Sequence, residues 1–408
     1  GPNRRDIHVG KGWEEGMPFN PWANIRDRET TLAARLSQAG IATQMVTDVA
    51  NGAVHGKNMW KGFEAYTVNR GQEGDACFSD HTVPLEYPVP PELIRYPESL
   101  YHRVLMNRSR RRSEEDYFAP GTFKTACEWL DRNSDRDDFF LWVEAFDPHE
   151  PWDPPQSYID HYDPGYTGRV LEFPPYGFYR KMGITDREIR HVAARYAAEV
   201  TMVDHAVGRL CATLEKLGIY EETAIVFTTD HGIYAGYEGD AGCVCKPWFV
   251  DEHGAWLQAG KNRVDNPTFL PLRTGIMRLP LIIRMPGQTT PRRVQSIVQP
   301  WDLHPTIMDL FGLTPPDDLQ GESLLPLMKG EAFPDRAYAF NACRHVAADT
   351  FQAMNRDLIY TCWPDGKQAP SLLDLKNDPA QETNVADRHP AVCAEMEDAL
   401  RSFCPAAF

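Results

Sequence analysis

The sequence lacks any apolar run that approaches the roughly 20 residues of a bilayer-spanning helix, and it lacks an excess of positive charge. Lys and Arg number 42 against 58 Asp and Glu, which gives a formal net charge of −16. These absences argue against insertion in a membrane and against general binding to nucleic acids or anionic membrane surfaces. An acidic chain can still bind an anion, but it needs a local cluster of cations or a metal ion. We therefore expect a small-molecule ligand, and neither a nucleic acid nor a membrane, as its partner.

Internal repeats, low-complexity tracts and a dense disulfide framework are also missing. The nine cysteines are scattered from Cys77 to Cys404, a distribution that favours a reducing compartment, so we expect a cytoplasmic protein. Cys243 and Cys245 form a C-x-C pair, which could ligate a metal. Because no second Cys or His pair stands at zinc-site spacing, buried or incidental thiols are the simpler interpretation. The sequence does not distinguish a monomer from a homo-oligomer.

What the sequence does contain is an alternation of short apolar segments with longer helical patterns, which is typical of an α/β fold with a mostly parallel sheet. The predicted strands are 42–48, 139–146, 223–232 and 279–287. The second and fourth of these segments are rich in consecutive apolar residues, so we expect both strands to be buried.

The strongest predicted helix runs from Thr185 to Leu217. Apolar residues recur there every three or four positions, Thr185 and Glu188 match a capping box, and Gly218 ends the pattern. The composition changes near residue 330, where shorter alternating segments and turns such as WPDG begin. This change predicts a main domain over 1–330 and a smaller α+β domain over 331–408.

One predicted strand ends in TTDHG, where Asp230 and His231 offer a carboxylate oxygen and an imidazole nitrogen to a divalent cation. Ligands collect beyond the carboxyl ends of strands in open α/β sheets, which makes this position a candidate metal site. An Asp-His turn in which the Asp caps the backbone would have the same sequence.

A second strand ends in FDPHEPWDPP, which places four side chains that can carry charge among prolines: Asp147, His149, Glu150 and Asp153. Prolines fix the backbone and lower the entropy of holding His149 in one pose. A Pro-rich surface loop with a solvated histidine would look the same.

In this order, the two strand ends and the long helix between them resemble the sulfatase branch of the alkaline phosphatase superfamily. DPHEPWDPP is similar to that family's P-H-x-P-x-x-x-P stretch, and AAEVTMVDHAVGRLCATLEKLGIYEETAIVFTTDHG is similar to its segment of helix, strand and metal ligands. LPLIIRMPG, VQPWDLHPTIMDLFGL and LLDLKNDPAQETNVA resemble later parts of the family. The resemblance implies an alkaline-phosphatase-like central sheet with helices on both faces, followed by a small C-terminal α+β domain.

The first ten residues, GPNRRDIHVG, resemble the family's nucleophile signature from its second position onward. That signature is C-x-P-x-R or S-x-P-x-R, and its Cys or Ser is oxidised to formylglycine. Gly1, Pro2 and Arg4 match the x, the Pro and the Arg, so we expect a formylglycine directly before Gly1. A true truncation or a tag remnant is the alternative, and a non-catalytic ligand-binding relative would then be expected.

The resemblance also implies the roles of other residues. Asp230 and His231 would hold one divalent metal ion, Ca²⁺ or Mn²⁺, while Arg4 would orient the nucleophile. His149 would contact the ester oxygens and donate a proton to the leaving group. Lys246 falls near the family's substrate-binding lysine, with an exposed lysine as the simpler alternative.

One departure from the family pattern bears on the reaction. Many arylsulfatases carry G-K-W-H after the strand that here reads ATQMVTDVANG, and its Lys and His are replaced around Thr47 and Asp48. His55 or Lys57 could compensate. We predict a sulfuric ester hydrolase, with the phosphonate monoester and phosphodiester hydrolases of the same branch as the close alternative.

Overall fold

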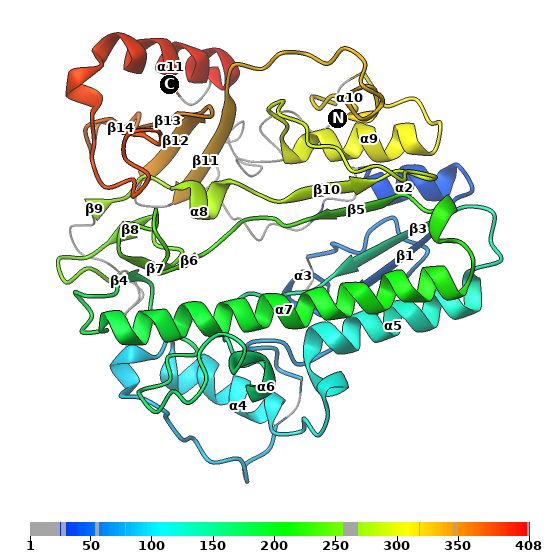
Figure 1. Cartoon of the computed structure of the whole chain (residues 1–408), viewed down its shortest axis with the longest axis horizontal. Coiled ribbons are helices and arrows are strands. Elements are labelled where there is room, and N and C mark those ends of the chain that lie inside the picture. Colours follow the sequence, from blue (N-terminus) through cyan, green and yellow to red (C-terminus); the bar gives the residue numbers. More distant parts are fainter. Residues whose placement is uncertain are drawn as a thin grey trace.

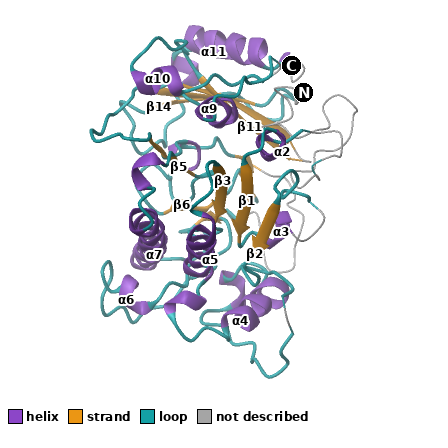
Figure 2. Cartoon of the chain, turned by 90° about the vertical axis from the view of Figure 1, so that its right-hand side faces the viewer, coloured by secondary structure: helices purple, strands orange, loops and turns teal. Residues whose placement is uncertain are grey.

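The computed structural model describes residues 25, 30–53, 57–77, 79–255, 268–317, 319–345, 348–405 and 408. Strands lie in the middle of the molecule. Helices α5 (Phe118–Asn133) and α7 (Asp186–Lys216) lie on one side of them, and α2 (Leu32–Gln38) and α9 (Leu303–Leu310) on the other (Figure 1, Figure 2). The predicted α/β architecture with helices on both faces is therefore confirmed.

The parallel sheet is built around β1 (Ala42–Thr47). This strand pairs with β2 (Ala65–Val68) on one edge and with β3 (Phe139–Glu144) on the other. A second pair consists of β5 (Ile225–Thr228) and β10 (Leu281–Arg284), which run antiparallel. All four predicted strands are present, and each is shorter than its predicted segment.

The expected burial of the strands at 139–146 and 279–287 is wrong for the described structure. Trp142 of β3 is 42% exposed and Ile282 of β10 is 63% exposed. Within the described ranges, β3 pairs with β1 alone and β5 with β10 alone, so no described strand covers their other edges. An apolar composition shows that a strand can be buried, but it does not show what covers each edge and face.

Helix α7 forms as predicted. The Thr185 side chain accepts a hydrogen bond from the backbone N–H of Glu188, and the Glu188 carboxylate accepts one from the backbone N–H of Thr185. Gly218 lies just beyond the helix with a φ of 76°, a conformation that glycine adopts without strain. The helix therefore carries the chain across the molecule from the loop after β3 to the start of β5.

Two small antiparallel sheets follow β5. One has the order β4 (Gly177–Phe178), β7 (Cys243–Cys245), β6 (Tyr234–Ala235), and the other pairs β8 (Phe249–Val250) with β9 (Thr268–Phe269). Cys243 and Cys245 are both buried, and the structure records no disulfide among the nine cysteines, all of which lie in the described residues. The three-stranded sheet fixes the position of the residue after β7, which is Lys246.

The C-terminal layer is an antiparallel sheet covered by α11 (Pro390–Phe403). Its strands follow in chain order: β11 (Ala339–His345), β12 (Ala348–Met354), β13 (Leu358–Cys362) and β14 (Ser371–Asp374). Phe351, Tyr360 and Leu372 from the sheet are buried with Met396 and Leu400 from the helix. The arrangement is that of a small α+β unit.

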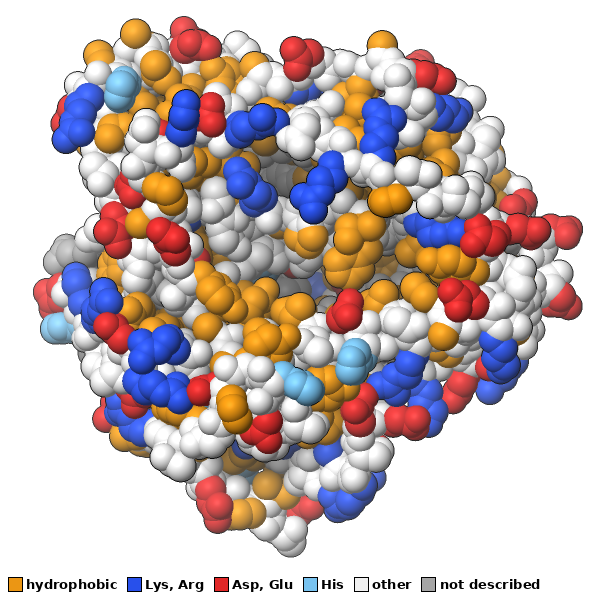
Figure 3. Space-filling view, in the orientation of Figure 1, with side chains coloured by type: hydrophobic (Ala, Val, Ile, Leu, Met, Phe, Trp, Pro, Cys, Tyr) orange, Lys and Arg blue, Asp and Glu red, His pale blue; other side chains and the backbone are white. Residues whose placement is uncertain are grey.

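Short helices connect these layers: α3 (Ala50–Ala53), α4 (His102–Arg108), α6 (Gln156–Ile159), α8 (Thr274–Met277) and α10 (Leu325–Lys329). Of the helices in the described ranges, none has the length and apolar character to cross a membrane. Acidic and basic side chains are interspersed over the face seen in Figure 3, which has a hollow near its centre with Lys and Arg on the upper rim. The net negative charge is therefore not gathered into one patch on this face.

Arg336 connects the start of the C-terminal layer to the main domain through a buried ion pair. Its two terminal nitrogens donate to the two carboxylate oxygens of Asp302, which is fully buried.

We expect Arg336→Met to lower the free energy of unfolding by about 3–5 kcal/mol, because it leaves a buried carboxylate without its cation. Denaturant unfolding measures this loss. Arg132→Met, which removes an exposed i,i+4 pair with Glu128, is the control with an expected loss below about 0.5 kcal/mol. Equal losses in the two variants would contradict the assignment.

Candidate active site

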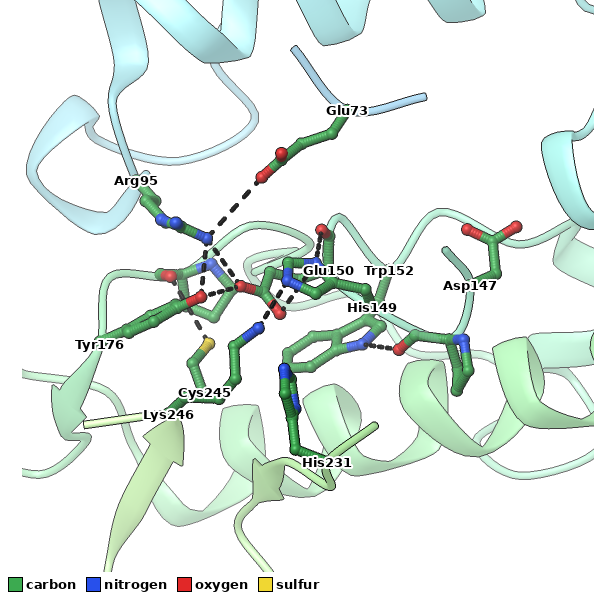
Figure 4. Close-up of polar contacts among 12 residues, drawn as sticks. Glu73, Arg95, Asp147, His149, Glu150, Trp152, Tyr176, His231, Cys245 and Lys246 are labelled. Atoms are coloured by element: carbon green, nitrogen blue, oxygen red, sulfur yellow. Dashed lines mark hydrogen bonds and ion pairs between the residues drawn. The ribbon is translucent and has the colours of Figure 1, made fainter. Parts of the chain in front are cut away.

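Three segments that are distant in sequence bring the predicted site residues together. His149 lies in the proline-rich loop after β3, Lys246 directly follows β7, and His231 follows β5. Figure 4 shows that His149 and Lys246 point toward each other and that the His231 ring points in the same direction as Lys246. The proline-rich loop and the small sheet thus meet at the contact of His149 with Lys246, and the segment after β5 leads into β6, whose Tyr234 pairs with Cys245 next to Lys246.

A direct contact at the centre of the site joins Lys246 and His149. The Lys246 Nζ lies 2.6 Å from Nε2 of His149, and Nδ1 of His149 donates to the carbonyl oxygen of Glu150 at 2.6 Å. With its proton on Nδ1, the imidazole can accept at Nε2, so Lys246 is the donor of the pair. Lys246 is partly buried, so the simpler alternative of an exposed lysine is wrong.

His149 is held as a neutral base. Burial lowers its pKa to about 3, and the positive charge of Lys246 acts in the same direction, against the opposing effect of Glu150. The ordinary histidine pKa that our interpretation of His149 as a proton donor assumed is therefore not retained in this geometry. Because Nζ of Lys246 donates to Nε2 of His149, the imidazole sets the direction of the Lys246 side chain.

Glu150 is the buried anion next to this pair. Its Oε1 accepts hydrogen bonds from Arg95 Nη1 at 2.8 Å and from the hydroxyl of Tyr176. Burial opposes ionisation, but the charges of Lys246 and Arg95 and the hydrogen bond from Tyr176 outweigh it and hold the pKa of Glu150 below its ordinary value. The carboxylate is ionised, and it balances the cations around it.

Backbone strain gathers at the same place. Three non-glycine residues next to the cluster have positive φ angles: Glu73 at 49°, Tyr96 at 48° and Cys245 at 63°. The Glu73 carboxylate lies 3.8 Å from Arg95, while Tyr96 and Cys245 are the chain neighbours of Arg95 and Lys246. Left-handed backbone in such residues has a cost of order 1–3 kcal/mol each and is typical of functional sites.

Asp230 and His231 are exposed at the tip of β5. The side chains are 83% and 42% exposed, and Oδ2 of Asp230 lies 3.4 Å from Nε2 of His231. Nδ1 of His231 donates to the carbonyl of Gly232 at 2.9 Å, which leaves Nε2 with a lone pair, the state that a metal-ligating histidine needs. The two side chains fit as neighbouring ligands of one cation. The part of the chain that the structure describes holds no group of three or more His, Cys, Asp or Glu that could bind a metal, so the role of these two as metal ligands stays a prediction.

The other acids of the proline-rich loop have structural contacts. Asp153 forms ion pairs with Arg108 and Arg111, and Asp147 accepts hydrogen bonds from Gln72 and from the backbone of Ala119. Burial raises the pKa of Asp147 to about 6. These contacts fix both ends of the loop that carries His149.

Thr47 and Asp48, which replace the family's Lys and His, are buried between the ends of β1 and β3. Asp48 accepts a hydrogen bond from the backbone N–H of Phe146 at 2.6 Å and from Thr122, and Thr47 donates to Glu144. Burial raises the pKa of Asp48. Both side chains are thus used to join strands. Lys57 is partly buried, whereas Arg4 and His55 lie outside the described residues.

Sequence reasoning missed Arg95 and Tyr176. Arg95 lies between an irregular proline-rich segment and a short helix, and Tyr176 lies in a loop before β4, so neither position follows a predicted strand. Both are far from His149 along the chain and meet it only in the folded structure. Glu150 was visible as a charged residue of the loop, but its sequence context gave no sign of burial.

Comparison with known proteins gives a consistent result. The sulfatase family model matches residues 11–313, and the model of the N-sulphoglucosamine sulphohydrolase C-terminal domain matches residues 272–404. Arylsulfatase K of Bos taurus is 26% identical over 302 residues, which cover 71% of this chain and 47% of that protein. Arylsulfatase K of Homo sapiens is 25% identical over 303 residues, 71% of this chain and 48% of that protein. The chain thus spans about half the length of these relatives.

Solved structures share the fold. The phosphonate monoester hydrolase of Agrobacterium radiobacter superposes with a TM-score of 0.65 at 19% identity, over 99% of this chain and 86% of that one. A protein solved in complex with its substrate D-glucosamine-2-N,6-O-disulfate superposes with a TM-score of 0.63 at 17% identity, over 100% of this chain and 88% of that one.

Proposed function

Because the chain belongs to the sulfatase family, we propose that it is a hydrolase of sulfate esters and that the Lys246–His149 pair acts at the ester. The observation that carries this proposal is the ammonium group of Lys246, held 2.6 Å from a neutral imidazole beside the tip of β5. A sulfate ester is anionic and repels a nucleophile, so its hydrolysis needs fixed positive charge at the ester oxygens. In a chain of net charge −16, Lys246 supplies that charge locally.

Each described residue has a stated task in this proposal. Lys246 donates a hydrogen bond to the ester and carries the proton that the leaving oxygen needs. His149 accepts from Nζ and sets the direction of the ammonium group. Asp230 and His231 would hold a divalent cation, which would neutralise anionic ester oxygens and lower the pKa of a hydroxyl nucleophile.

The nucleophile of the proposal is a formylglycine directly before Gly1, with Arg4 as its orienting cation. Peptide mass spectrometry of the full-length protein tests this part, because a formylglycine and its hydrate differ in mass from Cys and Ser. An unmodified Ser or Thr at that position would favour phosphodiester chemistry instead.

Phosphonate monoester hydrolysis is the second candidate. Two observations favour it: Thr47 and Asp48 are buried where many arylsulfatases have Lys and His, and a phosphonate monoester hydrolase shares the fold over 99% of this chain. A phosphonate monoester also carries one negative charge, so the same cations can bind it.

The two functions are separated by one assay of the full-length protein. 4-Nitrophenyl sulfate and 4-nitrophenyl phenylphosphonate have the same leaving group and are followed at the same wavelength. We expect kcat/KM to be higher for the sulfate. A higher value for the phosphonate would reverse the assignment, and no turnover of either ester would favour a ligand-binding relative.

The contribution of His149 depends on the leaving group. We expect His149→Ala to lower kcat for alkyl sulfates by about 10²–10³-fold and for 4-nitrophenyl sulfate by about tenfold or less, because an alkoxide needs a well-placed proton and a nitrophenolate does not. Steady-state kinetics with both esters measure the difference. His253→Ala, at an exposed histidine, is the control. Equal losses for both esters would assign His149 to binding alone.

A further inference from the structure

The structure contains two buried clusters, each made of a glutamate, an arginine and a tyrosine. In the first, Glu150 accepts from Arg95 and from the Tyr176 hydroxyl, and Arg95 Nη1 also donates to that hydroxyl at 2.7 Å. In the second, Glu172 accepts from Arg108 and from the Tyr101 hydroxyl, both at 2.6 Å. The two clusters have the same chemistry, but only the first adjoins Lys246.

The two oxygens of Glu150 have different surroundings. Oε1 receives the bonds from Arg95 and Tyr176. Oε2 is buried, accepts no hydrogen bond from the described part of the chain, and lies 3.4 Å from Nδ1 of His149. Arg95 and Tyr176 thus fix the carboxylate from one side, while its other side faces the imidazole.

Lys246 is surrounded by the same cluster. Its Nζ lies 5.9 Å from the ring centroid of Tyr176, which favours a cation over the ring face. Lys246 and Arg95 are both cations that favour the ionised form of Glu150 and of Glu73. The thiol of Cys245 contacts the carbonyl oxygen of Pro174 at 3.7 Å, and burial raises its pKa, so it adds no charge.

From this geometry we propose that Glu150 is a positioning residue for the Lys246–His149 pair, and that Arg95 and Tyr176 hold its carboxylate in place. The proposal rests on the proposed function of that pair. Glu150 acts through its backbone carbonyl, which holds Nδ1 of His149, and through its charge, which favours a cation at Lys246. The strained backbone at Tyr96 and Cys245 is where the chain brings Arg95 and Lys246 toward this carboxylate.

Tyr176→Phe is the first test, because it keeps the ring over Lys246 and removes only the hydroxyl. We expect kcat for an alkyl sulfate to fall by about 10–100-fold, as for other residues that orient a catalytic group, with KM changed less than threefold. Tyr101→Phe is the matched control, since it removes the equivalent hydroxyl from Glu172. We expect that variant to keep wild-type kinetics even where its melting temperature falls.

Glu150→Gln and Glu150→Asp are the second test. Glutamine keeps the shape of the side chain without the charge, whereas aspartate keeps the charge. We therefore expect kcat of Glu150→Asp to be at least tenfold higher than kcat of Glu150→Gln. Glu172→Gln is the control. If Glu150 only stabilises the fold, Glu150→Gln and Glu172→Gln would lower the melting temperature alike and leave kcat per folded molecule unchanged, which would overturn the proposal.

Amine labelling gives a readout that does not need turnover. An amine held against Nε2 of His149 reacts slowly with trinitrobenzenesulfonate, whereas a released amine reacts faster. We expect labelling of Lys246, followed by peptide mass spectrometry, to rise by about tenfold in Tyr176→Phe and Glu150→Gln, with exposed Lys124 as the reference in the same molecules. Unchanged labelling would reject the positioning role. Absence of ester hydrolysis in the wild type would instead reject the proposed function and leave the labelling result valid.

Discussion

Replacing Lys246 with methionine is expected to lower kcat/KM for sulfate esters by about 10²–10³-fold, the usual effect of removing one fixed donor from a site that stabilises developing negative charge. Methionine fills nearly the same space, so the change removes the ammonium group and keeps most of the packing. The measurement is steady-state hydrolysis with inorganic sulfate as the product. Lys124→Met, at an exposed lysine paired with Glu115, is the matched control and should keep wild-type kinetics.

The same variant has a second effect that separates charge from folding. The positive charge of Lys246 helps to lower the pKa of His149, so its removal should raise that pKa while burial continues to hold it below the ordinary value. NMR titration of the His149 ring measures the shift. A kcat/KM within threefold of the wild type, together with an unshifted His149, would contradict the contact between the two side chains.

Helix α7 shows what local sequence can predict. Its capping box, its apolar period and its terminal glycine are all encoded within about three dozen residues, and each signal predicts the same boundary. The structure confirms both ends. The strands were predicted equally well in position, because apolar segments bounded by polar residues mark where a strand lies.

Burial of the strands could not be predicted in the same way. Trp142 and Ile282 are apolar, yet both are exposed in the described structure, since their burial depends on which elements lie beside β3, β5 and β10. The periodicity of a strand reports on its own faces and contains no information about a neighbour from another part of the chain.

The residues of the candidate site also fall into two groups, those that the sequence could predict and those that it could not. His149 and Asp230 follow strands, so the rule for strand ends in α/β sheets finds them. Lys246 was found by resemblance alone, because β7 is three residues long and has no periodic signal. Arg95 and Tyr176 had neither signal, and only their contacts with Glu150, an ion pair from Arg95 and a hydrogen bond from Tyr176, connect them to the site. Charge balance in a buried cluster is a property of the folded chain.

Asp230→Ala is expected to remove the divalent cation and to abolish ester hydrolysis, while the fold stays intact. The carboxylate is 83% exposed at the tip of β5 and accepts local hydrogen bonds from Thr229 and His231, so the core loses no packing. Asp230 and His231 would each supply one metal ligand, so the loss of either leaves a single donor at this tip. Metal affinity falls steeply as ligands are removed.

Elemental analysis by mass spectrometry after dialysis gives the metal content, expected to fall from about one ion per chain to below about a tenth of that. Far-ultraviolet circular dichroism checks the fold. Asp160→Ala is the control, because Asp160 is an exposed carboxylate that accepts a hydrogen bond from Gln156, one helical turn away. His231→Ala should reproduce the loss of metal, since its Nε2 is the second donor at the same tip. Full metal content in both variants would mean that other residues bind the cation. Asp230 would then be the cap of an ordinary turn, where its Oδ1 accepts a hydrogen bond from the backbone N–H of His231 at 2.7 Å.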